Sequence, residues 1–198
     1  MSAPLGGPRG RVIAIVGAES TGKSTLARAV EHALRRAGHD AVTVGEFLRE
    51  FCDREGRTPR RDEQAGIAAE QTRLIDAAAA RHAIVVADTT ALMTAVYSEI
   101  VFGDTSLYAH AEAVQRGYAL TLITALDLPW QADGLQRDGP HVRAPVDEKV
   151  RDALARSRIA AATVAGLGDA RLAAALAVVN PELAAMTRPP LTPSHRGG

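Results

Sequence analysis

The sequence predicts an α/β fold in three layers, with a parallel sheet that is covered by helices on both faces. Short apolar runs alternate with longer segments of helical composition along the 198 residues, and strands that are separated by helices pair in parallel. Polar residues also follow directly after the apolar runs. Because ligands of such sheets bind beyond the carboxyl ends of the strands, these polar residues are expected to share one cleft.

The elements follow from the apolar pattern in order. Strands are expected at residues 12–16, 41–44, 83–87 and 119–126, with a short fifth at 162–165. Helices are expected at residues 23–37, 62–81, 90–102, 107–116, 147–160 and 169–179. The first helix has its apolar residues on one face, and Gly38 follows it, as a glycine often does at a helix C-terminus.

Composition indicates one domain at residues 11–186 between flexible tails at 1–10 and 187–198, which are rich in Pro, Gly and Arg. Lys plus Arg and Asp plus Glu both number 23, which gives no basic excess. Neither a nucleic-acid partner nor a membrane partner is therefore expected, whereas self-association as a homo-oligomer stays open. With Cys52 as its one cysteine, no run of about 18 apolar residues and no signal peptide, the chain is expected to be cytoplasmic.

Residues 17–24 read G-A-E-S-T-G-K-S and match the phosphate-loop pattern G-x-x-x-x-G-K-[ST] between a strand and a helix. Glycines let successive N–H groups face the β-phosphate, and the helix N-terminus adds its positive end. Lys23 is expected to bridge the β- and γ-phosphates, and the Ser24 hydroxyl to ligate Mg²⁺. The fold is thus expected to be that of a P-loop NTPase. Its ATP-binding residues are expected to be Gly17, Glu19, Ser20, Thr21, Gly22, Lys23, Ser24 and Thr25.

Two carboxylates follow strands and are candidates for the chemistry. Asp88 ends an apolar strand, where such a residue commonly holds Mg²⁺ or serves as a turn or cap residue. Glu46 follows the second strand and is a candidate to orient and deprotonate an acceptor hydroxyl. The sequence does not decide which of the two carboxylates is the base. Arg49 lies one helical turn or less beyond Glu46, where it pairs with either of these carboxylates or forms a structural ion pair.

The size of the chain favours a small-molecule kinase over multidomain motors, and no guanine-reading N-K-x-D segment is present. Kinases close an arginine-bearing lid over the phosphates. The polar stretch at about 127–146 fits that role, with Arg137 and Arg143 as catalytic candidates. The alternative is a solvated loop whose arginines make weak surface pairs.

Four segments together resemble one family. They are G-A-E-S-T-G-K-S-T at 17–25, G-E-F-L-R-E at 45–50, D-T-T at 88–90 and D-L-P-W-Q-A-D-G at 127–134. In this order they are similar to the nicotinamide riboside kinase domain of the bacterial NadR proteins, over residues 11–179. The resemblance implies a nucleoside-kinase-like fold, and transfer of phosphate from ATP with Mg²⁺ to the ribose 5′-hydroxyl of nicotinamide riboside.

The match has departures. The multidomain members of the family also carry a helix-turn-helix and an adenylyltransferase domain, for which 198 residues leave no room, so a stand-alone kinase is expected. The lid reads G-L-Q-R at 134–137 where G-L-R is expected, which leaves Arg143 as a rival to Arg137.

The resemblance also suggests substrate-binding residues. Trp130 is the one tryptophan and offers an indole face to a cationic pyridinium, or else seals the loop against the core. Asp133 either accepts hydrogen bonds from the substrate or fixes the turn. The remaining candidates are Glu46, Arg49, Asp88, Thr89 and Tyr97.

Other possibilities stay open beside these. Tyr97 and Gln71 lie on expected helices, where such residues usually pack. Gly166 to Gly168 is a candidate adenine-contacting loop. The alternative functions are another (deoxy)nucleoside kinase, or a nucleotide-dependent regulatory ATPase.

Overall fold

Five strands form one parallel sheet in the order β2-β3-β1-β4-β5, in a computed structural model that describes residues 9–131 and 140–187. The strands are β1 (Arg11–Val16), β2 (Ala41–Val44), β3 (Ile84–Asp88), β4 (Leu120–Thr124) and β5 (Ala161–Val164). Each neighbouring pair is parallel. The predicted α/β fold with a parallel sheet is confirmed. Each of the five strands lies within or close to one of the short apolar runs from which it was predicted.

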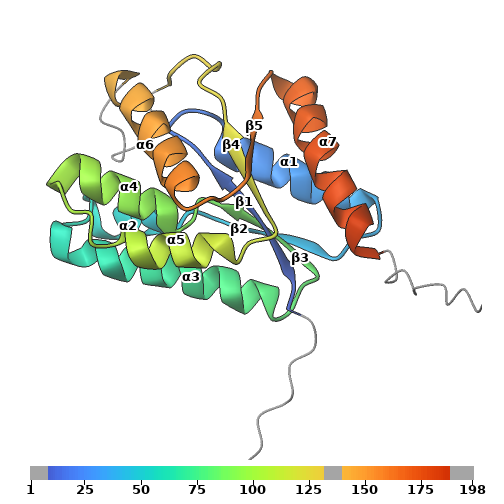
Figure 1. The fold of residues 1–198 in the computed structure, drawn as a ribbon, viewed down its shortest axis with the longest axis horizontal. Helices are drawn as coiled ribbons and strands as arrows, with labels where there is room; N and C mark the ends of the chain where they lie inside the picture. Colours follow the sequence, from blue (N-terminus) through green and yellow to red (C-terminus); the bar gives the residue numbers. More distant parts are fainter. Residues whose placement is uncertain (1–8, 132–139, 188–198) are drawn as a thin grey trace, which may run out of the picture.

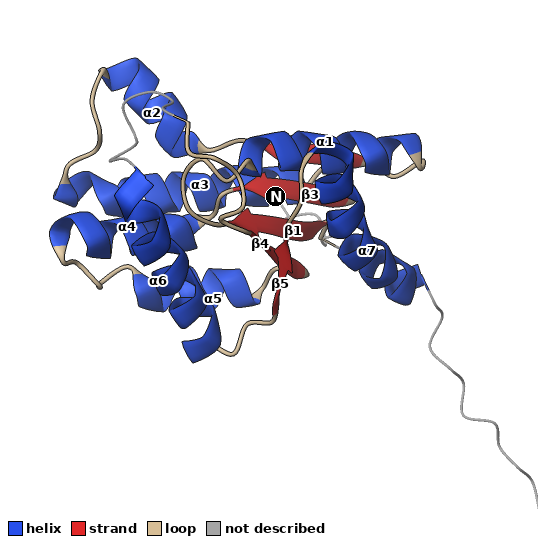
Figure 2. Cartoon of the chain, turned by 90° about the horizontal axis from the view of Figure 1, so that it is seen from above, coloured by secondary structure: helices blue, strands red, loops and turns tan. Residues whose placement is uncertain are grey.

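Helices cover both faces of this sheet. They are α1 (Lys23–Arg36), α2 (Phe47–Glu55), α3 (Gln64–Ala79), α4 (Ala91–Phe102), α5 (Tyr108–Arg116), α6 (Arg143–Arg156) and α7 (Gly168–Thr187). Two short 3₁₀ helices, η1 (Arg61–Glu63) and η2 (Pro140–Val142), precede α3 and α6. Helices α1 and α7 lie on one side of the sheet, and α3, α4, α5 and α6 lie on the other (Figures 1 and 2).

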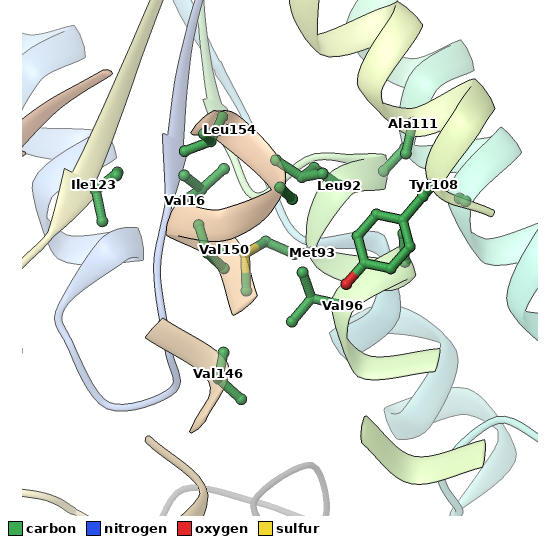
Figure 3. Packing of buried hydrophobic residues seen from close by; sticks show 14 of the residues in the cluster. Val16, Leu92, Met93, Val96, Tyr108, Ala111, Ile123, Val146, Val150 and Leu154 are labelled. Carbon is green, nitrogen blue, oxygen red and sulfur yellow. The ribbon is translucent and has the colours of Figure 1, made fainter. Parts of the chain in front are cut away.

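The central strand β1 shows why both faces of the sheet are apolar. Ile13 and Ile15 pack with residues of α1 and α7, whereas Val12 packs with α3 and Val16 packs with α4 and α6. Successive strand residues point to opposite faces, so a strand buried on both sides reads as a continuous apolar run. On the α4 side, residues of α6 lie between the strands and α4, as the labelled side chains Val146, Val150 and Leu154 show (Figure 3).

The structure differs from the expected elements at four points. The last helix continues past its expected end at residue 179 to Thr187. Helix α2 was not predicted, although its apolar residues Phe51 and Cys52 pack on Ile67 of α3. The segment expected as one helix at 62–81 divides into η1 and α3. The helix expected at 147–160 begins at Arg143, inside the expected lid, because a proline such as Pro145 is tolerated in a first turn whose N–H groups have no helical partner.

The helices were also compared with the length of a membrane span. Among residues 9–131 and 140–187, no helix is both long enough and apolar enough to cross a bilayer.

Candidate functional site

The loop between β1 and α1 takes conformations that its glycines permit. Gly17 has φ +142° and Gly22 has φ +77°, values that side chains with a Cβ rarely adopt. A Cβ at Gly17 would lie 2.3 Å from Thr124 Oγ1 at the end of β4. The Thr124 hydroxyl in turn lies 2.6 Å from Thr21 Oγ1, which donates to Ala18 O at 2.7 Å. The loop is therefore closely packed against the carboxyl end of β4.

Lys23 lies at the start of α1 and reaches back over the loop. Its Nζ donates to Ala18 O at 2.8 Å, which keeps the ammonium group close to the loop N–H groups. Gly22 precedes the helix without a side-chain cap. The first N–H groups of a helix have no partner within the helix, so this helix end is suited to an anion.

A cavity of about 890 Å³ lies at this end of the sheet. It is bounded by the phosphate loop, by the residues that follow β2 and β3, by α4, and by Leu128, Pro129 and Gln131. The structure brings twelve predicted site residues together along its walls. They are Glu19, Ser20, Thr21, Gly22, Lys23, Ser24, Thr25, Glu46, Arg49, Asp88, Thr89 and Tyr97.

Asp88 ends β3 beside the phosphate loop. Asp88 pairs with Ile15 of β1 in the sheet register, and only 4% of the surface of Asp88 is exposed. Asp88 Oδ1 is buried and has no hydrogen-bond partner among the described residues. An unpartnered carboxylate oxygen and the Ser24 hydroxyl on the same cavity are oxygen ligands of the kind Mg²⁺ prefers. These two residues therefore fit the predicted metal, with further positions left for water and phosphate oxygens.

Thr89 and Thr90 have separate roles after β3. Thr90 caps α4, since its side chain accepts from Leu92 N–H at 3.3 Å, and it also donates to Gln115 Oε1 at 2.7 Å. Thr89 has φ +80°, which is rare for a β-branched residue. Its hydroxyl is buried without a partner among the described residues, and Thr89 lines the cavity. Thr90 is thus the N-cap of α4.

Glu19 of the phosphate loop pairs with Tyr97 of α4. The Tyr97 hydroxyl donates to Glu19 Oε2 at 2.5 Å. Burial raises the pKa of Tyr97 well above its usual value, and the charges of Glu19 and Glu46 raise it further. Glu19 Oε1 is buried and has no partner in the described part of the chain. Glu19 was predicted as an ATP-binding residue, yet its contact is with the predicted acceptor side of the cavity.

Other predicted residues lie elsewhere. Gly17 shapes the loop without lining the cavity, and Trp130 and Arg143 are not among the described residues that line it. Trp130 is half-buried with Nε1 unpartnered among the described residues, and the same holds for Nε and Nη2 of the buried Arg143. Asp133 and Arg137 lie outside the described residues.

Residues 128–131, at the start of the expected lid, contact the phosphate loop directly. Gln131 N–H donates to Ser20 Oγ at 2.8 Å, and the Ser20 hydroxyl contacts Gln131 O at 3.3 Å. Leu128 and Pro129 also line the cavity, as does Leu167 of the candidate adenine loop. Leu128, Pro129 and Gln131 belong to the segment at 127–134 that resembles the NadR family, but they were not predicted as site residues.

Arg171 of α7 is a further residue that the sequence did not indicate. Only 5% of it is exposed, and its guanidinium donates to Thr21 O at 3.0 Å and to Asp127 Oδ1 at 2.8 Å. Gly166 N–H and the Arg171 guanidinium both hold the pKa of Asp127 below its usual value. Arg171 thereby joins the phosphate loop, Asp127 after β4 and the loop before α7.

Comparisons with known proteins show which folds and families the chain is similar to. Residues 12–171 match the model of a protein family described as an AAA domain. The fold is similar to a crystal structure of NadR protein in complex with NR, at TM-score 0.70 and 19% identity, over 87% of this chain and 51% of that chain. NadR protein in complex with NAD and AMP-PNP gives TM-score 0.68 and 19% identity, over 87% of this chain and 49% of that chain.

The chain therefore spans about half the length of the NadR chains that it matches. A shikimate kinase from Acinetobacter baumannii in complex with shikimate gives TM-score 0.47 at 17% identity, over 90% of this chain and 96% of that chain. No curated protein sequence matches significantly. The predicted resemblance to NadR is confirmed at the level of the fold.

Proposed function

Because the chain belongs to the family described as an AAA domain, we propose that it is an ATP-dependent kinase whose acceptor is the ribose 5′-hydroxyl of nicotinamide riboside. The observation that carries the proposal is the composition of the cavity. One wall is the phosphate loop, and the wall beyond it contains Glu46, Arg49 and Tyr97. A protein that only bound or hydrolysed a nucleotide has no need for a second polar wall next to the phosphates.

The cavity has the size of a small-molecule site. Its volume of about 890 Å³ lies towards the upper end of the roughly 300–1,000 Å³ that small-molecule sites occupy. The phosphates of ATP would fill the part around Lys23, Ser24 and Thr25. The part around Glu46 and Tyr97 then remains for an acceptor, and the two substrates would meet beside Asp88.

Phosphoryl transfer depends mainly on positioning and on charge neutralisation. The loop N–H groups and Lys23 would hold the phosphates of ATP, while Ser24 and Asp88 would hold Mg²⁺. The metal, when bound, supplies positive charge to the phosphate oxygens. Glu46 or Asp88 would orient the acceptor hydroxyl and accept its proton. Arg143 and Arg137 are the proposed lid arginines.

The acceptor is argued from charge and from resemblance. Charged side chains of both signs line the cavity, namely Glu19, Glu46, Asp88, Lys23, Arg28 and Arg49. The preference for a cation therefore depends on Glu19 and Glu46, which lie near Tyr97. Carboxylates at this place favour an acceptor that carries a positive charge, as a pyridinium ring does. NadR protein, which was solved in complex with NR, shares the fold. Trp130 and Asp133 stay proposed contacts to the heterocycle and to the ribose or amide, respectively.

The test is a direct assay with matched acceptors. Purified protein is incubated with Mg·ATP and nicotinamide riboside, with uridine, thymidine and deoxycytidine as comparators, and ADP and the mononucleotides are followed by mass spectrometry. Rapid product from nicotinamide riboside alone would support the proposal. Faster product from another nucleoside would refute the acceptor and retain the kinase. Slow ATP hydrolysis that no acceptor accelerates would favour a regulatory ATPase.

Variants of the two carboxylates and of Trp130 extend the assay. Glu46→Gln and Asp88→Asn are both expected to lose activity. A variant of the residue that holds Mg²⁺ should regain part of its kcat at higher Mg²⁺ concentration, whereas a variant of the base should not. Trp130→Leu should weaken binding of the cationic riboside more than that of an uncharged nucleoside, because an indole face attracts cations. Equal losses for both acceptors would remove Trp130 from the site.

A further inference from the structure

The side-chain amide of Gln71 connects two segments that follow neighbouring strands. Gln71 lies on α3, and only 2% of it is exposed. Its Oε1 accepts from Phe47 N–H at 2.8 Å, and its Nε2 donates to Gly45 O at 3.1 Å and to Thr89 O at 3.4 Å. All three partners are backbone groups, and Gln71 is not among the described residues that line the cavity. It therefore acts on the site through the backbone.

Two of these hydrogen bonds enclose Glu46. Gly45 O belongs to the peptide group before Glu46, and Phe47 N–H belongs to the peptide group after it. One amide thus holds both peptide planes that flank the Glu46 Cα, which has φ −77° and ψ 108° at the start of α2. Because the Cα–Cβ direction is set by these planes, the Gln71 amide fixes where the Glu46 side chain leaves the backbone.

The third hydrogen bond reaches Thr89, the neighbour of Asp88. Thr89 has φ +80°, a conformation that persists only where the surrounding structure holds it. The Nε2 group of Gln71 contributes to that hold at Thr89 O, while Ile15 O accepts from Thr89 N–H at 3.1 Å on the other side. The ends of β2 and β3 are consequently tied to the same side chain.

The orientation of the amide follows from its partners. With Oε1 towards Phe47 N–H and Nε2 towards the two carbonyls, every contact joins a donor to an acceptor. A flipped amide would put its NH₂ group against an N–H and its oxygen against two carbonyls, so one orientation satisfies the network.

We propose that Gln71 is a positioning residue for phosphoryl transfer, which sets the place of Glu46 relative to Asp88 in the acceptor half of the cavity. The proposal rests on the function proposed above, since it assigns a purpose to the two carboxylates. The proposal predicts that loss of the Gln71 amide leaves the phosphate loop intact and displaces Glu46 in the acceptor half of the cavity. Misplacement of a reacting group by about 1 Å costs on the order of 100-fold in rate.

The kinetic test uses Gln71→Met, which keeps the length of the side chain and removes its hydrogen bonds. At saturating Mg·ATP, kcat with the riboside is expected to fall roughly 10- to 100-fold, while the KM for ATP changes less than about threefold. Gln64→Met is the matched control, because Gln64 is a buried glutamine at the start of the same helix. The control is expected to keep kcat within about twofold of the wild type.

Two further variants separate positioning from a merely structural role. In a Glu46→Gln background, Gln71→Met should reduce kcat much less than it does in the wild type, because residues that act through one another are not additive. Gln71→Glu keeps the acceptor for Phe47 N–H but opposes two carbonyls with a carboxylate. Its activity relative to the wild type should rise as the pH falls, because the protonated carboxyl group becomes a donor again.

A readout without turnover keeps the inference separate from the proposed function. Phe47 is the first residue of α2, so its N–H has no partner within the helix. Exchange of this amide hydrogen, measured by NMR, should be on the order of tenfold faster in Gln71→Met and unchanged in Gln64→Met. If the wild type does not phosphorylate the riboside, the proposed function fails, while faster exchange still supports the hold on Glu46.

Two results would overturn the inference itself. One is a wild type that phosphorylates the riboside together with a folded Gln71→Met variant that keeps its kcat. The other is a Phe47 amide that exchanges equally fast in both proteins.

Discussion

Replacement of Gly17 by alanine tests how tightly the phosphate loop fits the end of β4. The new Cβ would lie 2.3 Å from Thr124 Oγ1 at a residue with φ +142°. The Thr124 side chain cannot rotate away freely, since its hydroxyl contacts Thr21 Oγ1 at 2.6 Å and Val16 O at 3.3 Å. Backbone strain of about 1–3 kcal/mol and overpacking of about 1–3 kcal/mol add to an expected loss of about 4 kcal/mol.

The matched control is Gly38→Ala. Gly38 also has positive φ, +89°, but a Cβ there would meet nothing within 4 Å, so only the conformational cost of about 1 kcal/mol remains. For a chain of this size, 1 kcal/mol shifts Tm by about 2–4 °C. Thermal unfolding followed by circular dichroism should therefore show a Tm lower by about 8–16 °C for Gly17→Ala and by about 2–4 °C for Gly38→Ala.

The steric part of this loss has its own check. Thr124→Ala in the Gly17→Ala background removes the oxygen that the new Cβ would meet, so the two changes together should cost at least about 1 kcal/mol less than the sum of the single changes. Equal Tm values for the two glycine variants, or strict additivity with Thr124→Ala, would refute the account of a loop pressed against β4.

Three more predictions concern charge and burial. Lys23→Met should lower kcat/KM by roughly 10²- to 10³-fold with an unchanged circular dichroism spectrum, and a fully active variant would contradict the role of the loop. Arg171→Met should cost about 2–4 kcal/mol in urea unfolding, because it leaves buried carbonyls and Asp127 without their donor, whereas Arg73→Met, in an exposed ion pair, should cost less than about 1 kcal/mol. Burial raises the pKa of each tyrosine of the chain, Tyr97, Tyr108 and Tyr118. The folded state holds these protons more tightly than the unfolded state, so this stabilisation is complete below about pH 10 and is lost as the pH rises beyond it. Ultraviolet absorbance should show tyrosine ionisation only together with unfolding, and a separate step near pH 10 in the folded protein would oppose this.

Much of the fold could be predicted because its signals are local. The strands are apolar runs that end in polar residues, and a strand such as β1 is apolar throughout because both of its faces are covered. Helix α2 was missed because its packing surface is small and its partner, Ile67, lies on another helix. The start of α6 was placed too late, since Pro145 was taken as part of the lid although a first turn accepts it.

Site residues could be predicted from the sequence where the residue type and its position indicate a chemical role. Lys23 belongs to a motif, Asp88 is the last residue of β3, and Glu46 lies two residues after β2, at the same edge of the sheet. Gln71 and Arg171 have no such signature, because their partners are mostly backbone groups of segments far away in sequence. Backbone groups are alike in every residue, so only the folded chain reveals which side chains they meet.

The order of the strands in the sheet has a consequence for folding during synthesis on the ribosome. The central strand β1 is made first, yet its two neighbours are β3 and β4, and the next strand to be made, β2, pairs with β3. Until Leu120–Thr124 has emerged from the ribosome, β1 therefore has one edge without a partner strand. This unpaired edge belongs to an apolar strand. Such an unpaired strand edge is a template for association with other chains. Co-translational chaperones or rapid elongation through β4 would protect this protein during the interval.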